Sequence, residues 1–481
     1  MTCHPSKGTV AARTLSVSLA LLLSACASAG GGATTAANAP DGDKAARILP
    51  PADPYPSTYR PLPSETLLIR NATILDGAGG RIEGGSVLLR DGKIAAIGTD
   101  VTAPPDARII DAAGKWVTPG IIDVHSHLGV YPSPSVEAHS DGNEATAPVT
   151  AEVWAEHSVW PQDPGFIRAL AGGVTTLQIL PGSANLIGGR SVTLKNVPSR
   201  TVQGMKFPGA PYGVKMACGE NPKRVYGGKG RAPSTRMGNF AGYRAAWIRA
   251  ADYRKQWEDY EKKGGDAKPP KRDLELETLK GVLDGDIIVH MHCYRTDEMV
   301  QVIDMAKEFG YKVGTFHHAV EAYKIADILA DNDICAAMWA DWWGFKMEAY
   351  DGIRENIPFV HKAGGCAITH SDSEIGIQRL NQETAKALAD AKKAGVEIAK
   401  EVAWTWLSLN PARALGIDDK TGSLLPGKNA DVVLWSGDPF SVYSKAEKVF
   451  IDGALIWDLD DPAYRPVMDF ELGQPGEGDA K

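Results

Sequence analysis

Two histidines, His125 and His127, stand two positions apart at the end of the apolar run 121–124. A run of this length and composition predicts a buried β-strand, in which side chains two positions apart lie on the same face. Both imidazoles would then point toward one place. Because zinc prefers nitrogen ligands at about 2.0–2.1 Å, the pair could supply half of a metal site.

Polar side chains close several other apolar runs in the same way. These are Glu220, His290, His292, His317, His318, His370 and Asp372. One buried histidine of this kind is usually a satisfied core residue. A histidine or an acid at the end of strand after strand instead indicates one shared site, because the carboxyl ends of parallel strands meet on one rim of a barrel.

The middle of the chain, 119–415, alternates strand and helix patterns. Strands are predicted at 120–127, 173–180, 213–218, 286–293, 311–318, 333–340 and 364–372. Helices are predicted at 239–262, 274–283, 297–309, 319–330, 352–363, 377–394 and 396–407. One more strand, expected between 183 and 205, would complete a (β/α)8 TIM barrel, a fold of the α/β class. The stretch from His125 to Asp372 fits the roughly 250 residues of this fold.

Short strands with Gly- and Asp-rich turns occupy 63–118, and a matching pattern returns at 416–460. This alternation of strands and tight turns predicts antiparallel pairing. We therefore expect a small β-sandwich built from both ends of the chain, followed by a tail at 461–481.

The first residues, 1–25, have the features of an export signal. Lys7 and Arg13 precede the apolar stretch 15–23. That stretch is too short to span a bilayer as a stable helix. The signal is therefore expected to be removed from the mature protein.

The end of this signal, residues 23–26, resembles the lipobox of bacterial lipoproteins. The resemblance implies cleavage before Cys26 and acylation of its thiol, with ordinary secretion as the alternative. The Ala-, Gly- and Pro-rich stretch 26–62 is expected to be a flexible tether. The protein is thus expected in the periplasm or at the outer membrane, touching the membrane only through its lipid anchor.

The overall charge is acidic, with a formal net charge of −8 and a hydrophobic content of 43%. A negative surface argues against nucleic acid and against an anionic bilayer as binding partners. The expected partner is a small-molecule substrate, and a homo-oligomer is compatible with this composition.

The cysteines form no CxxC pair and no dense framework. They are Cys3 and Cys26 in the signal, and Cys218, Cys293, Cys335 and Cys366 in apolar surroundings. The pattern favours buried free thiols over a disulfide scaffold for the last four.

Several of these motifs, in this order, resemble the amidohydrolase superfamily of metal-dependent hydrolases. They are PGIIDVHSH, GVTTLQ, GVKMACGENPKRVYG, VHMHCYR, HHAVEAYKIADIL and ITHSDSEIGIQRLN, followed by NPARALGI and GSLLPGKNADVVLW. The similarity covers about 64–460 and is closest to bacterial imidazolonepropionase-like members. It implies hydrolysis of carbon–nitrogen bonds other than peptide bonds, with two divalent metal ions, expected to be zinc, as cofactors.

Matched residue by residue, the resemblance assigns the metal ligands. His125, His127 and Asp372 would hold the more buried ion. His292 and His318 would hold the second ion.

The ligand that bridges the two ions is a glutamate in some members and a carboxylated lysine in others. Glu220 and Lys215 both match by position. Glu220 is preferred, because it follows the strand in the rim loop and needs no carbon dioxide adduct.

Two neighbouring choices depend on strand geometry. His317 and His318 are adjacent, so on a strand they would face opposite ways and only one could join the site. His318, followed by a small residue, is preferred. His290 and His370 each precede a ligand by two positions and are expected to contact ligands or substrate.

The resemblance also implies a mechanism. Two bridged ions would lower the pKa of a shared water from 15.7 to about 7, so that it attacks as hydroxide. Asp372 would take the proton of that water and return it to the leaving nitrogen. Asp372 is therefore the expected catalytic residue.

The substrate pocket is less clearly marked. Arg295 and Arg224 lie close to the expected rim and could bind a substrate carboxylate, although ion pairs with neighbouring acids explain them equally well. His370 is a further candidate contact. The aromatic segment 339–346 is expected to wall the pocket or to pack beneath it.

Two other functions remain open. A dipeptidase of the Xaa-Pro or acyl-amino-acid type could use the same barrel. A surface binding lipoprotein could retain the barrel without catalysis. Substrate screening separates the first from the leading interpretation, and metal content after purification separates the second.

Overall fold

The structure, a computed structural model, describes residues 53–264, 267–342 and 344–464. The predicted signal peptide, Cys26 and most of the predicted tail lie outside these ranges. Within the described ranges, no helix combines the length and the apolar composition that a bilayer-spanning segment needs.

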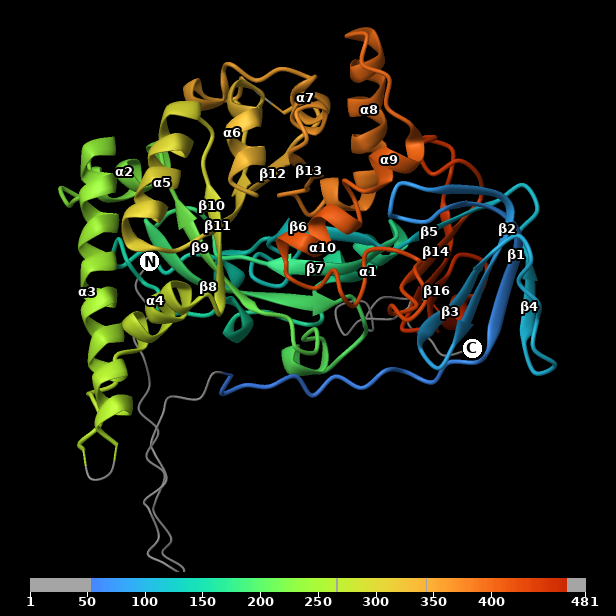
Figure 1. The fold of residues 1–481 in the computed structure, drawn as a ribbon, viewed down its shortest axis with the longest axis horizontal. Coiled ribbons are helices and arrows are strands. Elements are labelled where there is room, and N and C mark those ends of the chain that lie inside the picture. The colour runs from blue at the N-terminus through green and yellow to red at the C-terminus, as the bar shows by residue number, and fades with distance from the viewer. Residues whose placement is uncertain (1–52, 265–266, 343, 465–481) are drawn as a thin grey trace, which may run out of the picture. The chain divides into compact units, whose positions relative to one another are not determined.

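The central element is a barrel sheet of eight strands, as the sequence predicted (Figure 1). Its strands are β6 (Ile121–Ser126), β7 (Val174–Ile179), β8 (Ile187–Lys195), β9 (Tyr212–Ala217), β10 (Ile287–His292), β11 (Val313–His317), β12 (Cys335–Met338) and β13 (Cys366–Thr369). They pair in sequence order from β6 to β13. The strand expected between 183 and 205 is therefore β8.

One strand departs from the parallel arrangement. β8 runs antiparallel to both of its neighbours, β7 and β9. The reason is the short connection, 180–186, since parallel strands need a crossover of about a dozen residues or more. The loop at 180–186 consequently stays on the same rim as the end of β7.

Helices flank the barrel strands, and most of them match the predicted ranges. They are α1 (Pro164–Ala171), α2 (Glu220–Gly227), α3 (Arg236–Lys263), α4 (Leu274–Asp284), α5 (Thr296–Phe309), α6 (Ala326–Asp331), α7 (Asn356–Lys362), α8 (Leu380–Lys393), α9 (Lys400–Trp404) and α10 (Leu409–Ala414). Short 3-10 turns at Ala322–Ile325 and Gly376–Arg379 precede α6 and α8. The patterns did not predict α1, α2 or α10, and the predicted helix 396–407 is only the short α9.

Local sequence explains where these helices begin and end, as α4 illustrates. The carboxylate of Asp273 accepts a hydrogen bond from the backbone N–H of Leu276 at 3.1 Å, which satisfies a free donor of the first turn. Gly285 ends the helix in a left-handed conformation at φ 87°. The next strand, β10, follows at once and leads to the rim.

The outer strands β6 and β13 meet at the seam of the barrel. Side chains and single backbone contacts close this seam at the rim. Ser371 donates from its hydroxyl and from its backbone N–H to the carboxylate of Asp123, and the N–H of Asp372 donates to the carbonyl of His125 at 3.0 Å. Burial raises the pKa of Asp123 to about 7. The seam therefore brings Asp372 next to His125.

A second sheet is built from both ends of the chain, as predicted (Figure 1). It contains β1 (Leu67–Leu75), β2 (Arg81–Arg90), β3 (Lys93–Gly98), β4 (Arg108–Asp111), β5 (Trp116–Pro119), β14 (Val432–Trp435), β15 (Ala446–Ile451) and β16 (Ala454–Asp458). The ends join where β14 pairs antiparallel with β5. Hydrogen bonds connect all these strands into one sheet, with an apolar core of its own.

The described part of the predicted tether, 53–62, packs against the folded chain. Tyr59 is buried and its hydroxyl donates to Asp452 at 2.6 Å. Lys206 lies 3.0 Å from the carboxylate of Asp53. The tether prediction is thus wrong for these residues, because an aromatic ring and a carboxylate find partners far away in the sequence.

The prediction of free thiols is also wrong for the four cysteines of the folded part. Disulfides join Cys218 to Cys293 and Cys335 to Cys366. Cys335 and Cys366 are paired residues of the β12–β13 ladder, with their Cα atoms 4.5 Å apart. Such pairs lie within the distance that a disulfide spans. Strand register brings the partners together, and the spacing of cysteines along the chain does not reveal it.

Candidate metal centre

The core of the site is a triangle of ligand-type atoms from His125, His127 and Asp372. The two Nε2 atoms are 3.3 Å apart, and Oδ1 of Asp372 is 3.4 Å from His125 and 3.2 Å from His127. Two ligands of a tetrahedral zinc ion at about 2.0–2.1 Å lie about 3.3 Å from each other. The three atoms therefore have the mutual spacing of ligands on one ion.

The tautomer of His127 is fixed by the backbone. Its Nδ1 lies 2.8 Å from the carbonyl oxygen of Leu180, in the short loop between β7 and β8. A carbonyl can only accept, so Nδ1 carries a proton, and in the neutral ring the lone pair is then on Nε2. His127 is thus oriented with Nε2 toward the triangle, the nitrogen through which a neutral imidazole with its proton on Nδ1 binds a metal.

His317 and His318 both turn toward the barrel interior, which corrects the expectation that only one could do so. β11 ends at His317, and His318 has a left-handed backbone at φ 57°. Strand alternation no longer applies to a residue in that conformation. Nε2 of His318 lies 3.6 Å from Oδ2 of Asp372, while His317 contacts His125 through Nδ1 at 2.8 Å.

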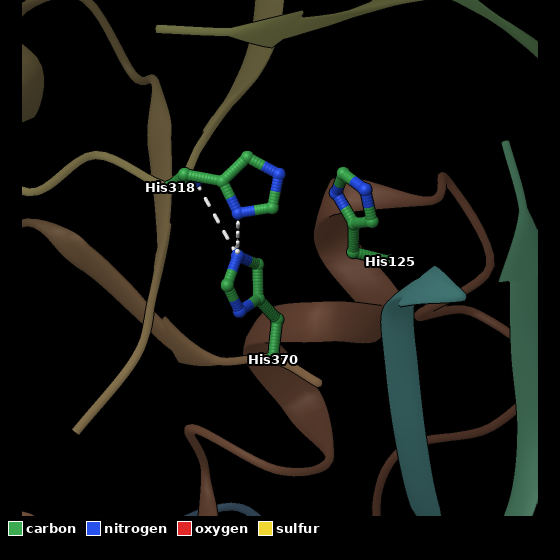
Figure 2. A group of neighbouring side chains, drawn as sticks. All are labelled: His125, His318 and His370. Atoms are coloured by element: carbon green, nitrogen blue, oxygen red, sulfur yellow. Dashed lines mark hydrogen bonds between the residues drawn. The ribbon is translucent and has the colours of Figure 1, made fainter. Parts of the chain in front are cut away.

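His370 fixes the orientation of the His318 ring through a hydrogen bond to Nδ1. Figure 2 shows the two rings facing each other, with Nδ1 of His318 2.8 Å from Nε2 of His370. The backbone N–H of His318 also donates to that Nε2 at 3.3 Å. Since a backbone N–H only donates, Nε2 of His370 is an acceptor and Nδ1 of His318 is a donor. This leaves the lone pair of His318 on Nε2, facing Asp372.

His292 completes the group of imidazoles at the rim. Its ring centre lies 4.9 Å from that of His318, and its Nε2 lies 3.4 Å from the amide nitrogen of Asn221. Its Nδ1 is buried without a hydrogen-bond partner among the described residues. A buried nitrogen without a partner is costly in a closed fold, which fits a site that binds a further group.

Lys215, and not Glu220, reaches the triangle. Nζ of Lys215 lies 3.4 Å from Nε2 of His125 and donates to the carbonyl of Pro181 at 3.1 Å. Glu220 is the first residue of α2, where its carboxylate lies 3.4 Å from Nζ of Lys346. The preference for Glu220 is therefore reversed, because the start of a helix carries its side chain toward Lys346.

Burial controls the charge of the site. It lowers the pKa of the buried imidazoles, to about 3 for His290 and about 4 for His370. The pKa values of His125, His292, His317 and His318 are also lowered, with burial as the main cause and Lys215 contributing to each. Burial also lowers the pKa of Lys215 to about 8. The imidazoles are therefore neutral at pH 7, as metal ligands must be.

Neither of the arginines predicted to bind substrate forms a hydrogen bond or an ion pair with the imidazoles or with Asp372 among the described residues. Arg295 forms an exposed ion pair with Asp297 at 2.9 Å, and Arg224 is exposed on α2. The basic group at the mouth is Lys346, which lies 4.2 Å from the ring centre of Tyr294. Sequence reasoning included Lys346 in an aromatic segment without giving it a role.

An aromatic wall borders the imidazoles on one side. The indole of Trp339 stacks on His318 with 4.4 Å between ring centres, and Trp342 stacks on Trp339 at 5.5 Å. Tyr294 and Phe345 lie against the same rings. Trp339 therefore packs against a site residue, and the exposed Trp342 and Phe345 continue this wall toward solvent.

Sequence reasoning missed Gln178, which is fully buried on β7 and lies 3.0 Å from Nε2 of His290. Its signal was an amide within the otherwise apolar and hydroxyl-bearing run 173–180. A polar side chain on the inward face of a buried strand requires a partner. The need for such a partner would have identified Gln178 as a candidate site residue.

Comparison with known proteins gives a consistent result. Residues 116–456 match the profile of the amidohydrolase family. The chain is 32% identical over 400 residues to the amidohydrolase tasK of Hapsidospora irregularis, covering 79% of this chain but only 40% of that protein. It is 24% identical over 406 residues to the imidazolonepropionase of Mesorhizobium japonicum, covering 76% of this chain and 90% of that enzyme.

Among solved structures, an amidohydrolase from Thermotoga maritima matches with a TM-score of 0.75 and 37% sequence identity. The match covers 82% of this chain and all of that chain, 100%. The fold and the sequence motifs therefore agree on the same group of proteins.

Proposed function

The chain belongs to the amidohydrolase family, whose members are hydrolases of carbon–nitrogen bonds, and we propose that it hydrolyses a non-peptide amide with the help of divalent metal ions. The observation that carries the proposal is the triangle of His125, His127 and Asp372. Its edges of 3.2–3.4 Å match the spacing of ligands on one ion. Neutral imidazoles and one carboxylate are also the donor set that suits zinc.

The ligands divide into two groups. His125, His127 and Asp372 would hold the first ion, and His292 and His318 the second. Lys215 would bridge both ions as a carbamate formed with carbon dioxide. Its pKa of about 8 supports this role, because only the neutral amine reacts with carbon dioxide and burial keeps part of the amine neutral at pH 7.

Bound divalent ions would supply Lewis acidity, which lowers the pKa of a water molecule and polarises a carbonyl oxygen. The chain itself supplies the proton transfer. Oδ1 of Asp372 lies near the two histidines of the triangle, and its Oδ2 lies near His318. The side chain of Asp372 is 26% exposed. A carboxylate so placed can take a proton from the attacking water and return it to the leaving nitrogen.

The mouth of the site indicates the type of substrate. The aromatic wall of Trp339 and Trp342 offers a flat apolar surface beside His318. Lys346 offers a positive charge on the same side of the site, near Tyr294. A small planar amide or cyclic amide that carries an acidic group would satisfy both. The likeness to an imidazolonepropionase supports the cyclic-amide class.

The test combines metal analysis with a substrate panel. Purified protein is analysed for bound metal and assayed with cyclic amides, N-acyl amino acids and Xaa-Pro dipeptides, before and after chelation. We expect bound zinc and turnover of a cyclic amide that is lost on chelation and restored by zinc. Protein without metal or turnover would support a binding lipoprotein instead, and selective dipeptide hydrolysis would support the dipeptidase alternative.

Export with a lipid anchor at Cys26 is part of the same proposal. The two disulfides support it, because disulfides persist in oxidising compartments such as the periplasm and are rare in the cytosol. Labelled palmitate should enter the wild-type protein and a Cys3→Ser variant but not Cys26→Ser. Equal labelling of all three proteins would contradict the anchor.

A further inference from the structure

A chain of hydrogen bonds runs from the triangle into the barrel. Nδ1 of His125 lies 2.8 Å from Nδ1 of His317. Nε2 of His317 lies 3.0 Å from Nδ1 of His290. Nε2 of His290 lies 3.0 Å from the amide of Gln178, which in turn contacts the hydroxyl of Ser191 at 2.9 Å. The chain thus links β6, β11, β10, β7 and β8.

Every member of this chain is shielded from water. The three histidines and Gln178 are at most 1% exposed, and so is Ser191. The ring nitrogens of His290 contact the imidazole of His317 and the amide of Gln178, so the chain places a neutral partner at each of them. A neutral imidazole has one donor nitrogen and one acceptor nitrogen. All hydrogen bonds along the chain must therefore run in the same direction.

Two directions are possible, and they differ at His125. If the amide of Gln178 donates to Nε2 of His290, then Nδ1 of His290 donates to His317 and Nδ1 of His317 donates to His125. His125 then carries its hydrogen on Nε2. If Gln178 accepts, the order is reversed, and Nε2 of His125 bears the lone pair. Only the second direction leaves His125 able to bind an ion through Nε2.

A contact at the other end of the chain supports the second direction. Nζ of Lys215 lies 3.4 Å from Nε2 of His125. Nζ of Lys215 donates to the carbonyl of Pro181 and has further hydrogens to donate, so in this contact Nε2 is the acceptor. The proton of His125 then lies on Nδ1, toward His317.

We propose that Gln178 is a positioning residue whose amide oxygen accepts from His290 and thereby fixes the tautomer that makes His125 a metal ligand. The inference rests on the metal centre proposed above and goes beyond it, because it names a control element with no contact to the ions. His317 and His290 transmit the effect. Each donates from Nε2 and accepts at Nδ1.

The orientation of the Gln178 amide follows from this requirement. A half-turn of the amide exchanges its oxygen and nitrogen without changing its shape. With the nitrogen toward His290, the amide oxygen has no hydrogen-bond partner among the described residues. With the oxygen toward His290, it accepts from the ring and from the hydroxyl of Ser191. Either orientation leaves one amide atom unpaired. The direction of the hydrogen bonds through His290 and His317 therefore decides which orientation the amide takes.

The first test compares zinc affinities. Gln178→Leu removes the acceptor while keeping a similar volume. Thr176→Val is the matched control, because Thr176 is buried on the same strand two positions earlier and its hydroxyl has no hydrogen-bond partner among the described residues. Affinities are measured by competition with a chromophoric chelator, and circular dichroism checks the fold of each variant.

We expect Gln178→Leu to weaken zinc binding by about tenfold to a hundredfold, the usual cost of removing a partner of a metal-bound histidine. Thr176→Val should bind zinc like the wild type. Equal affinity in all three proteins would overturn the proposal. Absence of zinc binding in the wild type would instead refute the metal centre itself, so the two failures are distinguishable.

A second measurement needs no variant of Gln178. In zinc-loaded wild-type protein labelled with 15N-histidine, NMR reports which ring nitrogen of His317 carries the proton, with the signal assigned from a His317→Gln variant. We expect the proton on Nε2. A proton on Nδ1 would show the opposite direction of the chain and would overturn the proposal.

Discussion

Two buried polar clusters in this molecule differ in whether their groups satisfy one another. In the ion-pair cluster, Nζ of Lys195 lies 2.9 Å from Asp452 and 3.5 Å from Asp431. Tyr59 donates to Asp452 and Thr421 donates to Asp431. Each charged group thus has a partner of opposite charge, and each carboxylate also accepts a hydrogen bond from a hydroxyl.

The metal centre is arranged in the opposite way. Three possible ligand atoms face one point there. They are Nε2 of His127, Nε2 of His125 and a carboxylate oxygen of Asp372. The buried Nδ1 of His292, beside them, has no hydrogen-bond partner among the described residues. The difference indicates that the ion-pair cluster stabilises the fold, while the metal centre requires a cation to complete it.

The largest contrast is expected in catalysis. Asp372→Asn keeps an oxygen for the metal but cannot take up the proton, so kcat should fall by about a hundredfold to ten-thousandfold. Zinc content should stay near that of the wild type. The measurements are steady-state kinetics and metal analysis.

The control for this variant is Glu374→Gln, an exposed acid two positions away. It should leave both kcat and zinc content unchanged. A kcat near the wild-type value in Asp372→Asn would remove the proton-transfer role from Asp372.

The next effect is on stability. Lys195→Met leaves two buried carboxylates without their counter-ion, so the free energy of unfolding should fall by about 3–5 kcal/mol. Zinc content per folded molecule should not change. Urea denaturation measures the first quantity and metal analysis the second.

Lys262→Met is the matched control, since Lys262 is 73% exposed and its ion pair with Glu258 lies on a helix surface. It should cost less than about 0.5 kcal/mol. If Lys195→Met lowered zinc content as well, the separation between the two clusters would be broken.

The acid sensitivity of the metal-free protein gives a smaller effect. The folded pKa of His370, about 4, is below its unfolded value of 6.5. Between these values the unfolded chain binds more protons, so the free energy of unfolding falls as pH falls through that window. His370→Gln should reduce this slope by up to one proton, or about 1.4 kcal/mol per pH unit.

Urea denaturation of metal-free protein at several pH values between about 7 and 4.5 measures the slope. His157→Gln, with its ring 48% exposed, serves as control and should leave the slope unchanged. An unchanged slope in His370→Gln would show that this ring does not limit stability in acid.

The smallest effects are expected at the mouth. Arg295→Ala removes an exposed ion pair and should change the free energy of unfolding by less than about 1 kcal/mol. It should also leave KM for an acidic cyclic amide unchanged, whereas Lys346→Ala should raise that KM several-fold. The opposite ranking of the two variants would restore the predicted role of Arg295.

The sequence predicted much of the fold because strand and helix periodicity are local. Apolar runs identified seven barrel strands. Repeated turn patterns at 63–118 and 416–460 predicted that the two ends of the chain build one small domain. The direction of β8 was not predicted, although the short loop 180–186 determines it. The register across strands was also hidden, so the disulfide partner of Cys335 could not be found.

Within the candidate site, the sequence by itself determined which residues stand at the strand ends, and side-chain alternation was enough to aim His125 and His127 together. Only the tertiary structure decided between Lys215 and Glu220, because the start of α2 directs Glu220 away from His125. It also decided that His317 and His318 both turn inward, through one left-handed residue. The local sequence pattern determines which residue stands at which position of a strand. The packing of distant strands determines which groups its polar atoms contact.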